Sequence, residues 1–165
     1  MRRRGRGQSL VEFALVVPLL FGLLFSVFDL GRGIWASDIA SHAASEAARY
    51  AIVHGGAASD PCPVGPPAAT AVIPTASTSC PYPSPSKQSI YDMAMASTIA
   101  AGGDASVTVC YGQGCTGDTD TAGGTNQRGT PVTVVVTVHI TILTGALIGA
   151  GSFNVSSTST MLVNH

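Results

Sequence analysis

An apolar segment near the N-terminus limits what this chain can fold into more than any other feature. Residues 13–28 contain no charge, and the wider stretch 10–30 would rise about 30 Å as an α-helix, the thickness of a bilayer's hydrocarbon core. Four of the eight Lys and Arg residues lie within the first six positions, and such basic flanks are typical of the cytoplasmic side of a membrane segment. The sequence therefore predicts a single-pass protein of the cytoplasmic (inner) membrane, with its N-terminus in the cytoplasm and its C-terminal domain extracytoplasmic. A buried helix of a soluble domain is the alternative, and it fits less well because the run is apolar on all sides.

The composition narrows the classes of function. A length of 165 residues fits one compact domain plus an anchor, and a net charge of -1 gives no basic face for nucleic acid. The four His residues are scattered, and no phosphate loop, nucleophile elbow or metal motif is present. Asp118 and Asp120 lie in a polar loop without the Glu that would complete a calcium series, so we interpret them as residues of a solvated turn. We expect no enzyme activity, no cofactor and no resident metal.

The four cysteines all follow the membrane segment, so the predicted topology places them where disulfides persist. They are Cys62, Cys80, Cys110 and Cys115, and four cysteines allow three connectivities. Local pairing, Cys62 with Cys80 and Cys110 with Cys115, is favoured because each pair brackets a loop-like stretch. A zinc site and free thiols are the alternatives, although no Cys-x-x-Cys spacing supports zinc.

The helical pattern continues beyond the apolar segment. Ile39, Ala43, Ala47 and Tyr50 recur at spacings of four, four and three within an Ala-rich stretch. We therefore expect one helix from about residue 10 to residue 53, ending at Gly55-Gly56. The next stretch, to about residue 86, holds eight of the ten prolines, which excludes a helix or a central strand and indicates a long loop.

The C-terminal part predicts a second helix followed by strands. Ser89 and Asp92 fit a capping box that would start a helix running to about residue 101. Residues 105–111 predict a short strand, whereas 132–142 and 153–163 alternate apolar and polar side chains with period two. The expected fold class is α+β, in which the long N-terminal helix packs on a small antiparallel sheet of about three to four strands.

These features divide the chain into five parts. The predicted division is 1–7, a basic cytoplasmic leader; 8–30, the transmembrane helix; 31–54, its extracytoplasmic continuation; 55–86, the Pro-rich loop; and 87–165, the second helix with the antiparallel sheet.

Two acidic residues flank the predicted membrane segment. A carboxylate well inside a bilayer costs roughly 2.5–3.5 kcal/mol on insertion scales and less near the interface. Glu12 lies at the cytoplasmic end, where it either snorkels to the interface or receives a partner charge from another protein. Asp29 at the other end has a simpler explanation, because Arg32 lies three residues later on the same helix face.

The same N-terminal residues resemble the TadE-like family, pilin-like minor subunits of the tight-adherence pilus system. The resemblance lies in the run from Gly7 to Leu15, in Pro18, in residues 29–32 and in the Ala-rich stretch 46–51. It implies a pilin-like fold and cleavage by a prepilin peptidase between Gly7 and Gln8, which makes Glu12 the fifth residue of the mature chain. It further implies that Glu12 of one subunit pairs with the new Gln8 amino group of its neighbour.

The resemblance implies a role in building an adhesion pilus. The implied partners are the prepilin peptidase, other pilin-like subunits, the pilus assembly platform and the lipid bilayer. One alternative is an uncleaved, membrane-anchored extracytoplasmic binding module. Another is a secreted protein released after Ala43, although that signal would be longer than the usual 15–30 residues.

Overall fold

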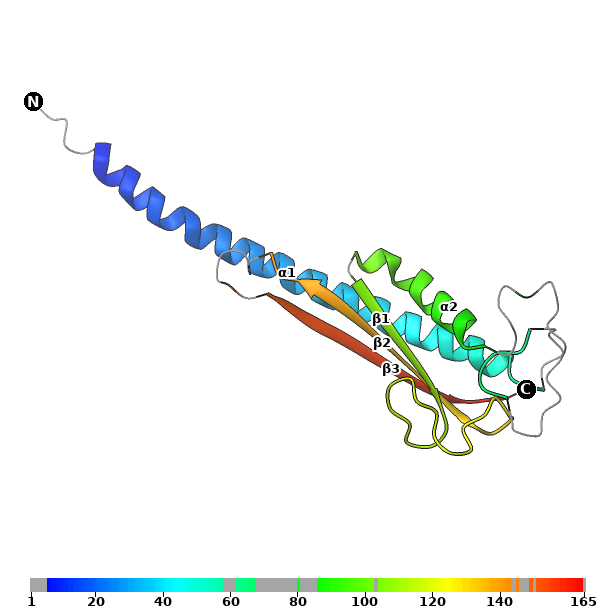
Figure 1. Ribbon diagram of the computed structural model, residues 1–165. Coiled ribbons are helices and arrows are strands. Elements are labelled where there is room, and N and C mark those ends of the chain that lie inside the picture. The colour runs from blue at the N-terminus through cyan, green and yellow to red at the C-terminus, as the bar shows by residue number, and fades with distance from the viewer. Residues whose placement is uncertain are drawn as a thin grey trace, which may run out of the picture.

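A computed structural model describes residues 6–57, 62–67, 80, 86–102, 104–143, 145, 149 and 151–164. Its α+β fold consists of two α-helices and three strands (Figure 1). In chain order these are α1 (Arg6–Val53), α2 (Gln88–Thr98), a 3-10 turn η1 (Ile99–Ala101), β1 (Asp104–Tyr111), β2 (Pro131–Thr141) and β3 (Ser152–Leu162). The predicted fold class is therefore confirmed, with a sheet of three strands.

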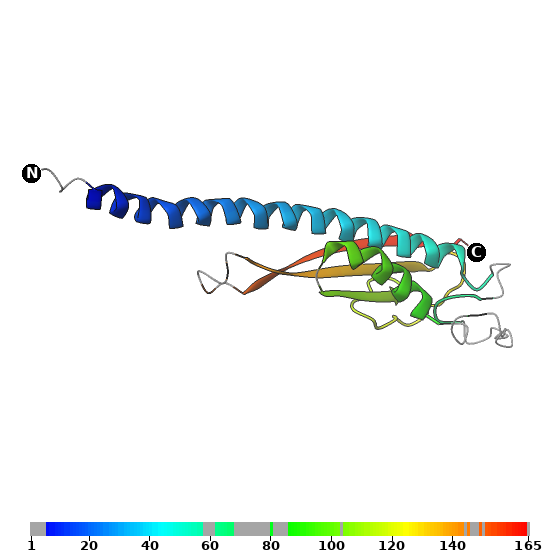
Figure 2. The same ribbon diagram turned by 90° about the horizontal axis from the view of Figure 1, so that it is seen from above.

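Helix α1 has two halves with opposite surroundings. Its 48 residues run without a break through Pro18 and span about 72 Å. The N-terminal half projects beyond the sheet and leaves its apolar side chains exposed (Figure 2). The C-terminal half lies against the domain and buries seven alanines: Ala36, Ala40, Ala43, Ala44, Ala47, Ala48 and Ala51. Because alanine has no side chain beyond Cβ, this stripe lets the helix backbone lie close to the sheet.

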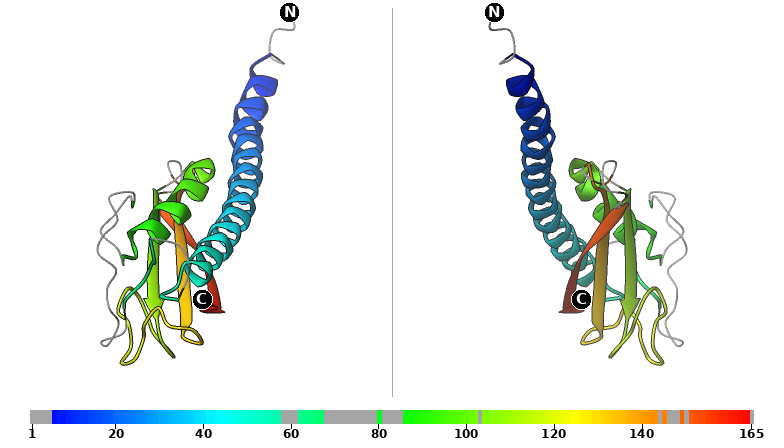
Figure 3. Two further views of the ribbon diagram at one scale, coloured as in Figure 1. Left: turned by 90° about the vertical axis from the view of Figure 1, so that its right-hand side faces the viewer. Right: turned by 90° about the vertical axis from the view of Figure 1, so that its left-hand side faces the viewer.

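The sheet is antiparallel throughout, with strand order β1-β2-β3. The register pairs Val109 with Val134 between β1 and β2, and Thr133 with Thr160 between β2 and β3. Both helices lie over one face of the sheet, as the two end views in Figure 3 show. The alternating valines of β2, Ile90 and Ala94 of α2 and the alanines of α1 form one core. The period-two prediction for β2 and β3 is thus confirmed.

The other sheet face is polar. Thr133 and Thr160 share a hydroxyl hydrogen bond of 3.0 Å, and His139 Nδ1 lies 2.7 Å from Asn154 Oδ1. Cross-strand pairs of this kind add a few tenths of a kcal/mol each to the stability of the sheet. This face is open to solvent in the isolated subunit.

The predicted capping box is wrong in detail. Helix α2 begins at Gln88, with Lys87 in the N-cap position and no side-chain cap bond, so Ser89 is already inside the first turn. The Gln88 amide donates instead to the Ser86 hydroxyl at 3.0 Å. The Asp92 carboxylate accepts from the Gln88 side chain and not from a cap amide. The start of α2 is displaced because Lys87 is held by long-range contacts, described below. Its end agrees with the prediction, since η1 follows α2 directly and stops at Gly102.

The Pro-rich loop lies largely outside the described residues, of which it contributes 55–57, 62–67, 80 and 86. The described part is tied to the end of α1. Val64 N donates to His54 O at 2.8 Å, and the buried Asn126 side chain donates to Val64 O at 3.0 Å. Asn126 also accepts from Gly56 N and donates its own amide to Pro66 O. Asn126 therefore joins the end of α1, the Pro-rich loop and the β1–β2 connection.

Candidate assembly site at the N-terminus of the long helix

The residues that the sequence marks for processing and assembly lie in the first two turns of α1. Gly7, Gln8 and Glu12 are all exposed. The side chains of Gln8 and Glu12 lie one turn apart, and Gln8 Nε2 donates to Glu12 Oε1 at 3.3 Å. The cluster of Gly7, Gln8 and Glu12 is called the assembly site below.

The assembly site is surrounded by apolar side chains. Leu10, Val11, Phe13 and Leu15 are exposed on all sides of the same turns. Helix α1 is long and apolar enough to cross a membrane. Its most apolar stretch of 18 residues is not buried inside the subunit. Glu12 therefore carries a formal charge on a surface that is otherwise suited to lipid or to the apolar helix of another subunit. This is the arrangement in which a partner charge has the largest effect.

A second charged pair lies at the other end of the apolar run. Asp29 Oδ1 is 3.9 Å from Arg32 Nη1, the contact that the sequence predicts. The structure adds two bonds to the end of the β2–β3 pair, because Leu143 N donates to Asp29 Oδ1 at 3.1 Å and Arg32 Nη1 donates to Thr141 O at 3.2 Å. No sequence signal marks these two bonds, since the partners lie more than 100 residues apart.

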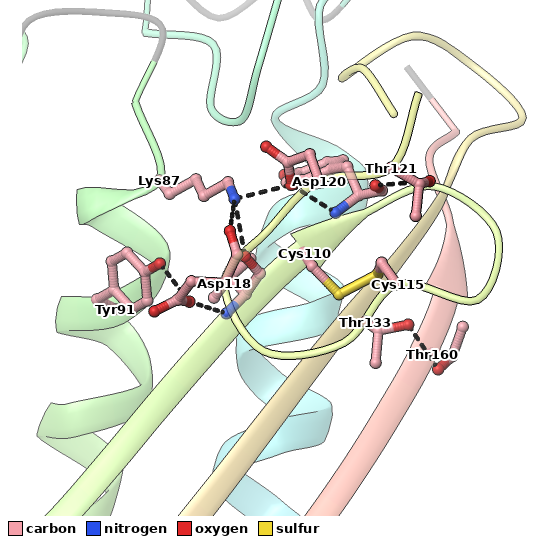
Figure 4. Close-up of a disulfide and its surroundings, with 11 residues drawn as sticks. Lys87, Tyr91, Cys110, Cys115, Asp118, Asp120, Thr121, Thr133 and Thr160 are labelled. Atoms are coloured by element: carbon pink, nitrogen blue, oxygen red, sulfur yellow. Dashed lines mark hydrogen bonds and ion pairs between the residues drawn. A yellow bond between two sulfur atoms is a disulfide. The ribbon is translucent and has the colours of Figure 1, made fainter. Parts of the chain in front are cut away.

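The cysteines form two disulfides, in the local pairing that the sequence favours. Cys62 is bonded to Cys80 across the Pro-rich loop, and Cys110, near the end of β1, is bonded to Cys115 in the following turn. The second disulfide closes the turn that leads to Asp118 and Asp120 (Figure 4).

Asp118 lies in an exposed turn, as the sequence predicts, and Asp120 is half-buried, but both carboxylates also bind backbone amides of β1. Figure 4 shows both carboxylates directed at the outer edge of β1. Asp118 Oδ1 accepts from Val109 N and Asp120 Oδ1 accepts from Tyr111 N, each at 2.8 Å. The i, i+2 spacing of the two aspartates matches the i, i+2 spacing of the strand amides that point outward. The side chains thus satisfy an edge that would otherwise be free to pair with another chain.

Lys87 and Tyr91 complete this cluster. Lys87 Nζ lies 2.7 Å from Asp120 Oδ1 and donates to Val109 O and Asp118 O. The Tyr91 hydroxyl donates to Asp118 Oδ1 at 2.7 Å, and burial together with this hydrogen bond raises the pKa of Tyr91 above its ordinary value. The cluster of Lys87, Tyr91, Asp118 and Asp120, called the edge cap, joins α2 to β1. In the part of the chain that the structure describes, no group of three or more His, Cys, Asp or Glu residues is arranged to hold a metal.

We expect Asp118→Ala to lower the free energy of unfolding by about 1–3 kcal/mol, because it leaves the buried Val109 amide without an acceptor. Chemical denaturation of the detergent-solubilised protein measures the change. Asp92→Ala is the matched control, since Asp92 is exposed and accepts a hydrogen bond from the Gln88 side chain one turn earlier on α2. Equal stability of the two variants would contradict the edge-cap role.

Tyr111 is a buried residue of β1 that sequence reasoning did not single out. Its ring lies against Gly65 of the Pro-rich loop, and its hydroxyl has no hydrogen-bond partner among the described residues. Burial, with a smaller contribution from Asp120, raises the pKa of Tyr111 above its ordinary value. The hydroxyl therefore stays protonated at neutral pH, and the ring serves as packing for the loop.

Comparison with known proteins confirms the resemblance that the sequence indicates. A model of the TadE-like protein family matches residues 7–49, a range that contains the assembly site and most of the alanine stripe of α1. No curated protein and no solved structure matches the chain significantly. The sheet, the edge cap and both disulfides lie outside the matched range. Over residues 7–49 this chain is similar to the TadE-like family.

Proposed function

We propose that this protein is a pseudopilin that acts in the assembly of a tight-adherence pilus from the cytoplasmic membrane. A prepilin peptidase removes residues 1–7, and the mature chain begins at Gln8. In the assembled complex, Glu12 of one subunit pairs with the Gln8 amino group of its neighbour. The observation that supports this most strongly is the exposed Glu12 carboxylate on an otherwise apolar helix, inside the segment that matches the TadE-like family.

The pairing follows from the energetics of charge in lipid. Removal of the basic tip leaves one new positive charge, the Gln8 amino group, four residues before Glu12 on the same helix. Each charge is costly alone in an apolar layer, and two adjacent subunits compensate both when one carboxylate meets the other's amino group. Since the contact joins fixed positions of two helices, it also sets the axial register between subunits.

The position of the cleavage site on the helix favours access by the peptidase. The bond between Gly7 and Gln8 lies in the first turn of α1, where the amides have no partner within the helix and the end frays. Gly7 weakens this turn further, because glycine is about 1 kcal/mol less favourable than alanine in a helix. Opening this turn exposes the bond without disturbing the rest of α1.

We expect Gly7→Leu to abolish leader removal, because a large side chain then precedes the cleaved bond. The N-terminal peptide of the membrane-extracted protein, read by mass spectrometry, gives the result directly. The unmodified protein should begin at Gln8, whereas the Gly7→Leu protein should retain the arginines. Gly5→Leu makes the same chemical change two residues upstream and should still be cleaved. An unmodified protein that retains its basic tip would instead favour the uncleaved membrane-anchored binding module.

The domain outside the membrane has a structural role in this proposal and not a catalytic one. Its helices cover one sheet face and leave the polar face, with Thr133, His139, Asn154 and Thr160, open toward partners. The other pilin-like subunits and the assembly platform are the partners that the family match favours.

A further inference from the structure

The apolar surface of α1 does not end at Asp29. Leu30, Ile34 and Trp35 lie beyond the charged pair and remain 66%, 59% and 58% exposed. The stretch from Leu10 to Phe28 spans about 28 Å, which already fills the hydrocarbon core, so these three residues lie in the next 10 Å or so of the bilayer, at headgroup depth. Trp35 is the single tryptophan of the chain, and tryptophan is enriched at this depth.

The end of the β2–β3 pair lies beside the same stretch of α1. The Asp29 and Arg32 bonds to Leu143 N and Thr141 O hold it there. Gly33 allows close contact on the adjacent turn, since a Cβ at this position would lie 3.0 Å from the Phe153 ring. Figure 1 shows the end of β2 beside α1, where the helix leaves the sheet.

The residues of β2 and β3 at this end of the domain carry no formal charge. No Asp, Glu, Lys or Arg occurs after Arg128. Leu143 is 49% exposed, and a groove of about 550 Å³ runs between the helix and the strands. Leu30, Ile34, Ile142, Phe153 and Val155 line most of it.

Asp29 is compatible with this depth because the strand end covers it. Asp29 is 7% exposed, whereas its neighbours on α1 face outward. An ionised carboxylate at the membrane surface is stabilised by hydrogen bonds and by opposite charge, and here the Leu143 amide donates a hydrogen bond and the Arg32 guanidinium forms an ion pair at 3.9 Å. The strand end therefore covers the Asp29 carboxylate, so that little of its charge reaches the surface of α1.

We propose that the end of the β2–β3 pair is a second membrane contact of this protein. It enters the boundary between headgroups and acyl chains in the leaflet opposite the basic tip, and phospholipid methylenes fill the groove beside Leu30 and Ile34. The occupant is a phospholipid surface, because the groove is continuous with the lipid-facing side of α1 and the acidic side chain in its lining, Asp29, is paired with Arg32. The proposal rests on the membrane-spanning role of α1 and is independent of leader removal and of Glu12 pairing.

Tryptophan quenching in vesicles tests the contact. The full chain carrying Trp35→Phe is reconstituted in phosphatidylcholine vesicles with or without bromine on the acyl chains near the headgroup, and one new tryptophan is introduced as Leu143→Trp. Val53→Trp is the matched control, because Val53 is an exposed apolar residue of the same helix about 30 Å beyond Arg32. We expect brominated lipid to quench the tryptophan at position 143 several-fold more than the one at position 53.

Two results would overturn the proposal. One is weak quenching at both positions, which would mean that the strand end does not reach the bilayer. The other is equally strong quenching at both positions, which would mean that the whole domain lies flat on the bilayer. Thr141→Trp gives the same reading at the neighbouring exposed strand position if Leu143→Trp does not fold. Failure of the proposed function can be told apart from failure of this membrane contact. A chain that keeps its basic tip and assembles no pilus still gives the expected quenching if its strand end enters the bilayer.

Discussion

Glu12→Gln is expected to abolish pilus assembly while leaving membrane insertion intact. The amide occupies nearly the same volume but cannot compensate the amino group of a neighbouring subunit, so that charge stays buried without a partner in the assembled complex. Insertion of the single chain does not suffer, because replacing a carboxylate by an amide lowers the cost of placing α1 in lipid. Electron microscopy of surface pili and membrane fractionation of the same cells give the two readings.

A matched control separates charge from helix stability. Glu46→Gln makes the same chemical change on the same helix, and the Glu46 side chain accepts a hydrogen bond from Ser97, on α2. An amide oxygen can keep that bond, so normal piliation is expected. Normal piliation in the Glu12→Gln strain would refute the pairing between subunits.

The second large effect is expected at Gly65, where Gly65→Ala should lower the free energy of unfolding by about 2–5 kcal/mol. Gly65 has a φ of 83°, and an L-residue there costs about 1–2 kcal/mol. The added Cβ would also lie 2.5 Å from the Tyr111 ring and hydroxyl, and overpacking of this kind costs about 1–3 kcal/mol more. Chemical denaturation of the solubilised protein, with its disulfides intact, measures the sum.

Gly129→Ala isolates the backbone contribution. Its φ of 86° is nearly the same, yet a Cβ there meets nothing within 4 Å, so only the smaller penalty is expected. Tyr111→Phe in the Gly65→Ala background should recover part of the loss, because it removes one of the three contacting atoms, the buried hydroxyl, which has no partner among the described residues. Equal losses for the two glycine variants would show that Tyr111 does not pack tightly under the loop.

The sequence predicts the regular elements well because each has a local cause. The alternation in β2 places a valine or isoleucine in the core at every second position, and in β3 it leaves alternate residues half-buried against the same core. The stripe of alanines in α1 follows the helical repeat, and the predicted Ala43 and Ala47 are buried. The buried stripe is wider than predicted, because it also contains Ala40, Ala44 and Ala48. Both features depend only on neighbouring residues along the chain.

The contacts that hold these elements together were not predictable in the same way. The edge cap pairs Asp118 and Asp120 with a strand nine residues earlier, and their pattern alone is also typical of an ordinary turn. The start of α2 depends on the long-range contacts of Lys87, which override a capping signal at Ser89. The bond from Leu143 to Asp29 joins residues 114 positions apart, and no local pattern indicates it.

The unbroken course of α1 has a consequence for how a subunit faces its neighbours. From Glu12 to the buried alanines the chain is one helix, so every residue between them contributes about 100° of rotation and 1.5 Å of height. A contact made at Glu12 in the membrane therefore fixes the rotation of the sheet about the helix axis outside the membrane. The number of residues between the two, as much as their polarity, determines which side of each domain meets the next.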